Sequence, residues 1–262
     1  MQRSNLPTGV KHSLVLLGLL FSLLMLNAQE RRLVWAEEFN ETELNENDWS
    51  FQLGDGCPDI CGWGNRERQI YTKSNHRLES GMLYIQARKE KDRYTSTRIS
   101  TKGKKQFQYG RYEVRAKLAV GEGVWPAFWL LGSNIDEVGW PLSGEIDVLE
   151  YVGRAPEEIF TTLHTKDKNG DFANSKTTRI PNIEEGFHVY AAEWNAERIA
   201  FFVDGIKVYT FAPKERTAAI WPFDQPFYLL LNLAIGGHFG GPKVDDSIFP
   251  QEFVVDYIRV YQ

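Results

Sequence analysis

Cysteines, long apolar runs and linker-like segments are all scarce in this 262-residue sequence. The apolar stretch at residues 13–28 has 16 residues, fewer than the ~20 that a helix needs to cross a bilayer. No Pro/Ser/Gly-rich linker, charge block or internal repeat interrupts the chain after it. We therefore expect no membrane-spanning helix and a single domain over residues 29–262.

Residues 1–28 have the pattern of a secretory signal peptide. Arg3 and Lys11 precede the apolar run, small residues Asn27-Ala28 follow it, and a charged segment begins just afterwards. No cysteine follows the apolar run, so a lipid anchor lacks support. This pattern predicts a protein that is secreted, to the periplasm or the medium, and free of the membrane once the signal is cleaved.

Positive charge is also in short supply. Residues 1–28 hold two of the 30 Lys and Arg and none of the 35 Asp and Glu, so the remainder has 28 basic against 35 acidic residues, a net charge of −7. So acidic a chain is a poor partner for nucleic acid phosphates or anionic lipids. A neutral substrate suits it better.

Only two cysteines are present, Cys57 and Cys61. Secretion permits a disulfide, but a loop this small gains little chain-entropy stabilisation from one. The sequence leaves a local disulfide and two free thiols equally open. Two cysteines alone do not form a zinc site.

Alternation of apolar and polar residues with period two is the main structural signal that is present. Asn195-Ala196-Glu197 and Asp204-Gly205 separate such runs and are typical of hairpin turns. No run longer than about a dozen residues has helical periodicity. Many short strands with turn residues between them predict an all-β sandwich or barrel. The predicted strands cover residues 81–89, 110–118, 188–195, 198–205 and 252–261.

Aromatic residues are abundant, with eight Trp, eleven Tyr and sixteen Phe. Most belong to a core by default, and any single Trp can be explained that way. Four tryptophans, however, lie beside turns and small residues near one acidic motif, where flat indole faces could stack on sugar rings. These are Trp63, Trp125, Trp129 and Trp140.

The acidic motif is SGEIDVLEYVG at residues 143–153. In a regular strand Glu145 and Asp147 share one face, whereas Glu150, five positions after Glu145, points to the other. Either Glu150 lies outside the strand, or an extra residue near Val148-Leu149 forms a β-bulge that returns it to the acidic face. Bulges are enriched beside active sites for this reason.

Two carboxylates on one face fit glycoside hydrolysis. With the bulge, the Cα atoms of Glu145 and Glu150 would be about 13 Å apart. Side chains leaning together could shorten the carboxylate separation to the ~5–5.5 Å of retaining glycosidases. A solvated acidic strand, or one that binds calcium, is the alternative. Adjacent carboxylates repel and raise each other's pKa, and the apolar flanks and tryptophans place them in a cleft, so catalysis is favoured.

These residues resemble glycoside hydrolase family 16, in its laminarinase-like branch. The E-x-D-x-x-E signature corresponds to Glu145, Asp147 and Glu150, and further similar segments run from WAEEFN near residue 35 to VVDYIRVYQ at the C-terminus. The resemblance implies a β-jelly-roll sandwich (concanavalin-like) of two curved antiparallel sheets, with the substrate across the concave one. It implies that Glu145 is the nucleophile, that Glu150 is the acid/base, and that Asp147 assists both.

The resemblance also implies sites around the catalytic residues. Asn65 and Arg98 match polar residues that grip sugars on the non-reducing side, although the following segment, Arg66 to Gln69, is more basic than is usual. An aromatic platform is implied at Trp125, Trp129 and Trp140, and a histidine beside the acid/base at His164, for which a purely structural role is the alternative. No cofactor is required for catalysis. A structural calcium is implied at main-chain oxygens of Glu38 and Gly81 and the carboxylate of Asp256, as suits a hard cation.

The predicted function is a monomeric endo-β-1,3-glucanase that also accepts mixed β-1,3/1,4-glucan. Lichenase-type relatives have one residue fewer between the Asp and the second Glu, so this chain belongs with the bulged branch. That branch includes agarases and carrageenases, which makes a galactanase the alternative enzyme, although net negative charge argues against a sulfated substrate. A non-catalytic β-glucan-binding lectin shares the architecture, and fold alone does not exclude it.

Overall fold

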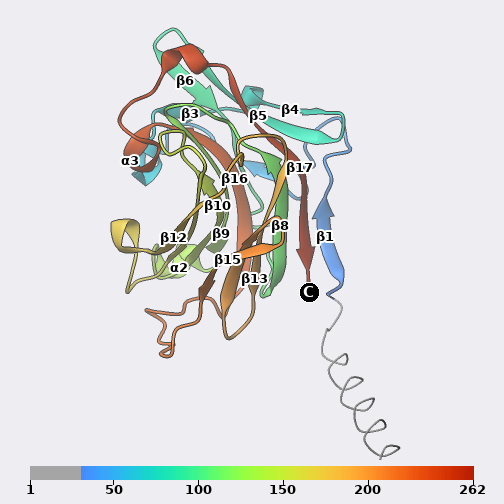
Figure 1. The fold of residues 1–262 in the computed structure, drawn as a ribbon, viewed down its shortest axis with the longest axis vertical. Helices are drawn as coiled ribbons and strands as arrows, with labels where there is room; N and C mark the ends of the chain where they lie inside the picture. Colours follow the sequence, from blue (N-terminus) through green and yellow to red (C-terminus); the bar gives the residue numbers. More distant parts are fainter. Residues whose placement is uncertain (1–30) are drawn as a thin grey trace, which may run out of the picture. The chain divides into compact units, whose positions relative to one another are not determined.

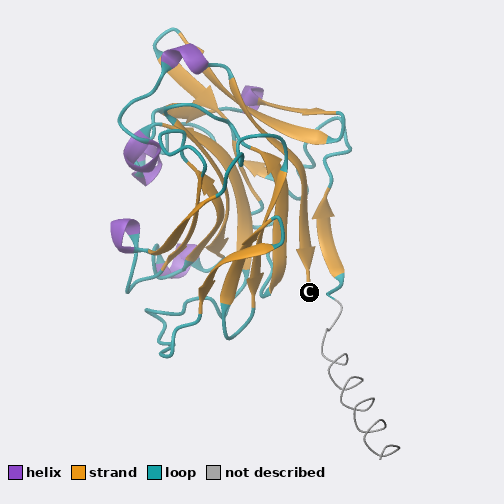
Figure 2. Cartoon of the chain, viewed as in Figure 1, coloured by secondary structure: helices purple, strands orange, loops and turns teal. Residues whose placement is uncertain are grey.

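The computed structural model describes residues 31–262, and the predicted signal peptide at residues 1–28 lies outside them. Leu33–Gln262 form one compact unit. Strands dominate it, and within the described part α-helix occurs only as the short segments α2 (Ile135–Val138) and α3 (Gly237–Gly240) (Figure 2). Over these residues we find no helix with the length and apolar character that a membrane crossing demands.

Two sheets form the unit (Figure 1). In the larger one, strands follow the order β15-β14-β13-β8-β17-β5-β6-β3, with β1 and β4 paired to β17 and β5. The strands of this sheet are β1 (Leu33–Glu37), β3 (Gln69–Tyr71), β4 (His76–Glu79), β5 (Met82–Glu90), β6 (Arg93–Ser96), β8 (Gly110–Lys117), β13 (His188–Trp194), β14 (Ile199–Val203), β15 (Ile206–Phe211) and β17 (Gln251–Tyr261).

The smaller sheet has seven strands in the order β12-β11-β10-β9-β16-β7-β2. All of its pairings are antiparallel. Its strands are β2 (Ser50–Phe51), β7 (Arg98–Ser100), β9 (Val124–Gly132), β10 (Glu145–Tyr151), β11 (Glu158–His164), β12 (Asn174–Arg179) and β16 (Phe227–Ile235). The acidic motif therefore forms β10, inside the sheet rather than at its edge.

The hydrophobic core lies between the two sheets. On β9, Phe128 and Leu130 belong to it, whereas the alternate residues Trp125 and Trp129 are only partly buried and point to the outer face of the smaller sheet. The strands of this sheet are curved in Figure 1. The architecture is a β-jelly-roll sandwich of two curved sheets, as predicted.

The five strands predicted from alternation are confirmed as β5, β8, β13, β14 and β17, and both predicted hairpin turns are present. Alternation did not predict β9 and β16. All nine residues of β16 are buried, because its outer face is covered as well as its core face. A continuous apolar strand of this kind carries no period-two signal.

The predicted β-bulge is present in β10. Against β9, Asp147 lies opposite Trp129 and Leu149 opposite Phe128, so Val148 has no partner of its own. Against β11 the register shifts between the same acidic residues, Asp147 and Glu150. The extra residue restores Glu150 to the face that carries Glu145 and Asp147.

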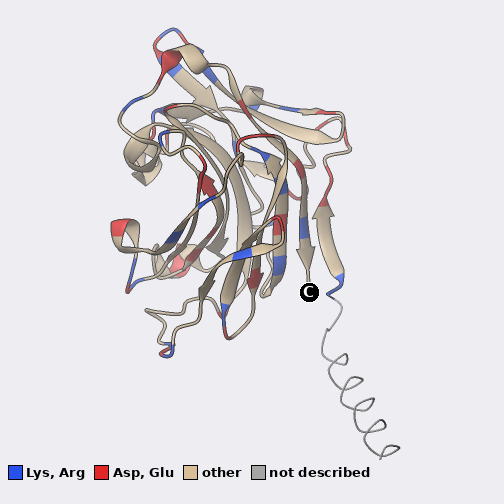
Figure 3. Cartoon of the chain, viewed as in Figure 1, with Lys and Arg blue, Asp and Glu red and all other residues tan. Residues whose placement is uncertain are grey.

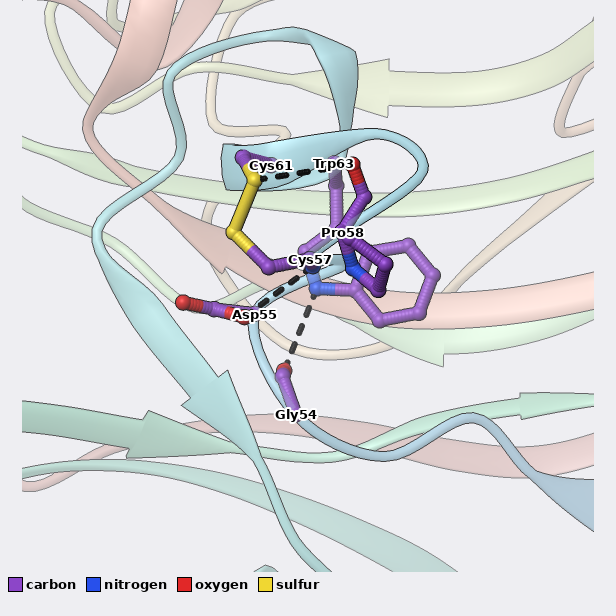
Figure 4. Close-up of a disulfide and its surroundings, with 6 residues drawn as sticks. All are labelled: Gly54, Asp55, Cys57, Pro58, Cys61 and Trp63. Carbon is purple, nitrogen blue, oxygen red and sulfur yellow. Dashed lines mark hydrogen bonds between the residues drawn. A yellow bond between two sulfur atoms is a disulfide. The ribbon is translucent and has the colours of Figure 1, made fainter.

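Cys57 and Cys61 form a disulfide, which settles the choice that the sequence left open (Figure 4). The bond closes a loop just before η1 (Cys61–Gly64), the turn that carries Trp63. The indole Nε1 of Trp63 donates a hydrogen bond to the carbonyl of Gly54 at 3.3 Å. The disulfide and this bond fix the loop from both ends.

Candidate active site

The register of β10 against β11 sets the composition of the site. Glu145 lies opposite His164, Asp147 opposite Thr162, and Glu150 opposite Phe160. On the other side β9 brings its partly buried tryptophans to the same face. The three acidic residues are therefore bordered by aromatic and hydroxyl side chains, not by open solvent.

Glu145 is the least buried of the three acids. Its Oε2 accepts a hydrogen bond of 2.8 Å from Nε1 of Trp140. Its Oε1 lies 4.0 Å from Nε2 of His164. The Trp140 side chain is 47% exposed, and its ring centroid lies 5.7 Å from that of His164. It can therefore contact a ligand while it orients Glu145.

Glu150 is buried, with two donors on its carboxylate. Trp125 donates to Oε1 from its Nε1 at 3.1 Å, and the Thr162 hydroxyl donates to Oε2 at 3.2 Å. Burial raises the pKa of Glu150 to about 8, and the negative charge of Asp147 acts in the same direction. At neutral pH this carboxyl group holds a proton, as a general acid must.

Asp147 lies between the other two acids and is 3% exposed. Burial, followed by the charge of Glu145, raises the pKa of Asp147 to about 7. Nε2 of His164 approaches its Oδ2 to 3.3 Å, although the orientation does not give that oxygen a hydrogen bond. A charge on Asp147 in turn keeps Glu150 protonated.

Two influences act on His164. Burial favours the neutral ring, but the charges of Glu145 and Asp147 outweigh it and raise the pKa of His164 to about 10. In the neutral ring Nδ1 accepts a bond of 3.2 Å from the backbone N–H of Gly170, and this bond is lost when Nδ1 takes up the second proton. Nε2, which faces Asp147, carries a proton in both the neutral and the protonated ring. The acidic contacts of His164 are with Asp147 and Glu145, whereas the resemblance suggested a place beside Glu150.

The residues expected on the non-reducing side also lie together. Arg98 is 9% exposed, and its guanidinium lies 4.4 Å from the Trp63 ring and 4.9 Å from the Trp129 ring. Nε1 of Trp129 donates to Asn232, which is opposite Arg98 in the β16–β7 pairing. Asn65 is partly buried beside them, and its amide nitrogen donates to Glu67.

Three residues that border the site were not predicted from the sequence, namely Thr162, Glu67 and Asn232. Thr162 could have been found, because it alternates with His164 along β11 and so faces the acids. Glu67 likewise alternates with Gln69 and Tyr71 at the start of β3, which signals a shared polar face. Asn232 sits in the wholly buried β16 and gave no signal.

The expected calcium ligands lie at neighbouring strands of the larger sheet: Glu38 follows β1, Gly81 precedes β5, and Asp256 lies in β17. Glu37 pairs with Ile258 and Leu83 pairs with Val255, so Glu38 and Gly81 flank the segment that contains Asp256. Both carboxylates have arginine partners: Glu38 binds Arg259 at 2.7 and 3.0 Å, and Asp256 binds Arg115. To bind a metal, Asp256 would have to exchange Arg115 for it.

Acidic and basic residues both occur along the strands and loops in the view of Figure 3.

The raised pKa values predict how stability depends on pH. From about pH 5, the folded protein holds a proton on Asp147 up to about pH 7 and on Glu150 up to about pH 8, whereas the unfolded chain has released both, so the free energy of unfolding falls as pH rises. Each such proton contributes roughly 1.4 kcal/mol per pH unit. In Glu150→Gln the melting temperature, followed by circular dichroism, should fall less steeply over this range.

Glu197→Gln, in the exposed β13–β14 hairpin, is the matched control and should keep the wild-type slope. Equal slopes for wild type and Glu150→Gln would show that Glu150 titrates normally and that its burial has no electrostatic consequence.

Known proteins share both the sequence pattern and the fold. The family model described as glycosyl hydrolases family 16 matches residues 64–258. A β-glucanase of Rhodothermus marinus is 42% identical over 248 residues, which cover 88% of this chain and 85% of that protein. The laminarinase of Flavobacterium sp. UMI-01 is 62% identical, with a TM-score of 0.87 over 88% of this chain and 100% of that one. The laminarinase catalytic domain of Thermotoga maritima MSB8 is 39% identical, with a TM-score of 0.85 over 89% and 99%. The chain therefore belongs to glycosyl hydrolase family 16.

Proposed function

We propose that this protein is a retaining endo-β-1,3-glucanase that cleaves laminarin-type glucans. One observation carries the proposal: a bulge in β10 places Glu145, Asp147 and Glu150 on one face, among tryptophans and with Glu150 protonated at neutral pH. A lectin needs neither this set of acids nor a carboxyl group of raised pKa. Relatives named β-glucanase and laminarinase support the same activity.

In the first step Glu145 attacks the anomeric carbon while Glu150 gives its proton to the leaving glycosidic oxygen. The C–O bond breaks, and a covalent glycosyl–Glu145 ester forms. The indole N–H of Trp140 holds Glu145 Oε2 and leaves Oε1 for the attack. The Nε2 proton of His164, 4.0 Å from Glu145 Oε1, stabilises the negative charge that Glu145 carries before the attack and regains in the second step. Asp147, at 3.3 Å from the same Nε2, attracts this proton when ionised.

In the second step Glu150, now ionised, takes a proton from water as the water attacks the same carbon and releases Glu145. Two inversions give net retention of anomeric configuration. While ionised, Glu150 keeps the hydrogen bonds from Trp125 and Thr162, which stabilise its charge between the two steps.

Replacing the nucleophile separates catalysis from binding. Glu145→Gln should lower kcat on laminarin by at least about a thousandfold, because the amide cannot form the glycosyl ester, while laminarin binding by calorimetry stays within a few-fold of wild type. Glu197→Gln, in the exposed hairpin, serves as the control and should retain full activity. Near-wild-type turnover by Glu145→Gln would falsify the mechanism.

The substrate is proposed to be β-1,3-glucan, with mixed β-1,3/1,4-glucan as a second substrate. Incubation with laminarin, lichenan, agarose and carrageenan, followed by sizing of the products, should give internal cleavage of laminarin, weaker cleavage of lichenan and none of the galactans. Proton NMR should show β-anomers released first. Cleavage of agarose or carrageenan in preference to laminarin would favour the galactanase alternative.

We further propose a structural calcium at Glu38, Gly81 and Asp256, remote from the catalytic acids. Calcium should raise the melting temperature by a few degrees over EDTA-treated protein, because it binds only the folded state. Asp256→Asn should remove that shift and leave the catalytic rate at low temperature unchanged. A melting temperature that is identical with calcium and EDTA contradicts the site.

Secretion as a monomer, after removal of residues 1–28, is also proposed. The disulfide supports an oxidising compartment. Sequencing the N-terminus of the exported protein should place it near Gln29, and size-exclusion chromatography should give the mass of one chain. An N-terminus at Met1, or a dimer, would contradict the corresponding part.

A further inference from the structure

Glu67 is a buried acid that the proposed mechanism does not use. It is 9% exposed, yet its carboxylate is fully engaged: Asn65 Nδ2 donates to Oε1 at 3.2 Å, and Gln69 Nε2 and the Tyr71 hydroxyl donate to Oε2 at 2.6 and 3.1 Å. Burying a carboxylate is unfavourable unless it is compensated. The presence of a buried acid at this position therefore requires a functional explanation.

The hydrogen bonds around Glu67 have a fixed direction. Gln69 accepts a bond of 2.7 Å from the backbone N–H of Ile235 through its Oε1, so its amide nitrogen has to face Glu67. Because Oε2 of Glu67 accepts hydrogen bonds from Gln69 and Tyr71, its Oε1 accepts one from the amide nitrogen of Asn65. The carbonyl oxygen of the Asn65 side chain then points away from Glu67. Because Asn65 is partly exposed, that oxygen can accept a bond from a hydroxyl group.

The backbone of Asn65 is held as well. Its carbonyl accepts a bond of 2.8 Å from the backbone N–H of His238, and Arg68 N–H donates to Ile235 across the same junction. With the main chain fixed, the remaining freedom of Asn65 is the orientation of its amide. Among the described residues, the hydrogen bond to Glu67 is the one that sets the orientation of this amide.

A cation, Arg98, also acts on Glu67. Arg98 lies between the rings of Trp63 and Trp129, and its Nε lacks a hydrogen-bond partner among the described residues. The charge of Arg98 lowers the pKa of Glu67 against the larger effect of burial, so the two charges attract across a poorly solvated space.

We propose that Glu67 is the positioning residue of the sugar-binding subsites on the non-reducing side: it turns the carbonyl oxygen of Asn65 towards the glucan. This rests on the proposed β-glucan substrate. Because Glu67 would act through other side chains, we expect it to affect substrate binding and not the chemical step.

Glu67→Gln tests the orientation directly. The introduced amide must turn its oxygen to Gln69 and Tyr71, whose donors are fixed, and so presents its NH2 to Asn65, which has to flip. A donor then faces the sugar where an acceptor had been. We expect the Kd for laminarihexaose, measured by calorimetry in the Glu145→Gln background, to rise about tenfold. In the active enzyme KM should rise similarly and kcat should stay within about twofold.

A compensating double variant separates positioning from simple support of the fold. In Asn65→Asp/Glu67→Gln, the introduced aspartate accepts the NH2 of the introduced glutamine through one oxygen and offers the other to the sugar, with the net charge retained beside Arg98. Its Kd should return to within about threefold of the parent. Asn65→Asp alone sets two carboxylates together and should bind more weakly than the double variant.

Melting temperatures identify variants that are unfolded. Even if Glu67→Gln does not fold, the comparison of Asn65→Asp with the double variant tests whether Glu67 positions Asn65. A Kd unchanged in Glu67→Gln, or a double variant that binds no better than Asn65→Asp, overturns the proposal. A wild-type protein that cleaves no glucan contradicts the proposed function instead. The Kd values of the Glu67 and Asn65 variants still test the role of Glu67, since binding does not depend on turnover.

Discussion

One extra residue in β10 is the constraint on which the site depends. Side chains alternate along a strand, so without Val148 as a bulge, Glu150 would point between the sheets among Phe128, Leu130 and Ile146. An acid there would have no hydrogen-bond donors. With the bulge, Glu150 meets Trp125 from β9 and Thr162 from β11, while Tyr151 still enters the core. Because of the bulge, β10 presents apolar side chains to the core on one face and all three acidic side chains on the other.

Burial then gives the acids different properties. Glu145 is partly exposed and receives an indole N–H, whereas Glu150 is almost completely covered and its pKa is raised. Asp147, at 3% exposure, adds its charge between them. Neighbouring carboxyl groups whose surroundings favour different protonation states are what acid and nucleophile roles require. The sheet achieves this by graded coverage together with the charges of the neighbouring acids, and no lysine or arginine is bonded to the three acids among the described residues.

Much of this could be predicted from the sequence because period-two patterns report which face is buried. Strands with one solvated face, such as β8 and β13, were predicted, and so was the bulge, from the odd spacing of Glu145 and Glu150. β16 was missed because both of its faces are covered, and β9 because apolar residues occupy its outer face as well as its core face. Pairings between distant segments were also beyond reach: nothing local shows that Arg259 binds Glu38, or that Gln69 meets Ile235. The disulfide remained open because its small loop makes either state energetically acceptable.

The tryptophans connect the acids to the proposed sugar platform. Trp125, Trp129 and Trp140 each donate their indole N–H to a polar side chain of the protein, namely Glu150, Asn232 and Glu145. Those N–H groups are therefore not available to a ligand, and what each ring can offer a sugar is its flat face. Since the same bonds orient the carboxylates, ring orientation and acid orientation are not independent. A glucan that stacks on these rings would thus be placed relative to the acids by the very bonds that hold the acids in position.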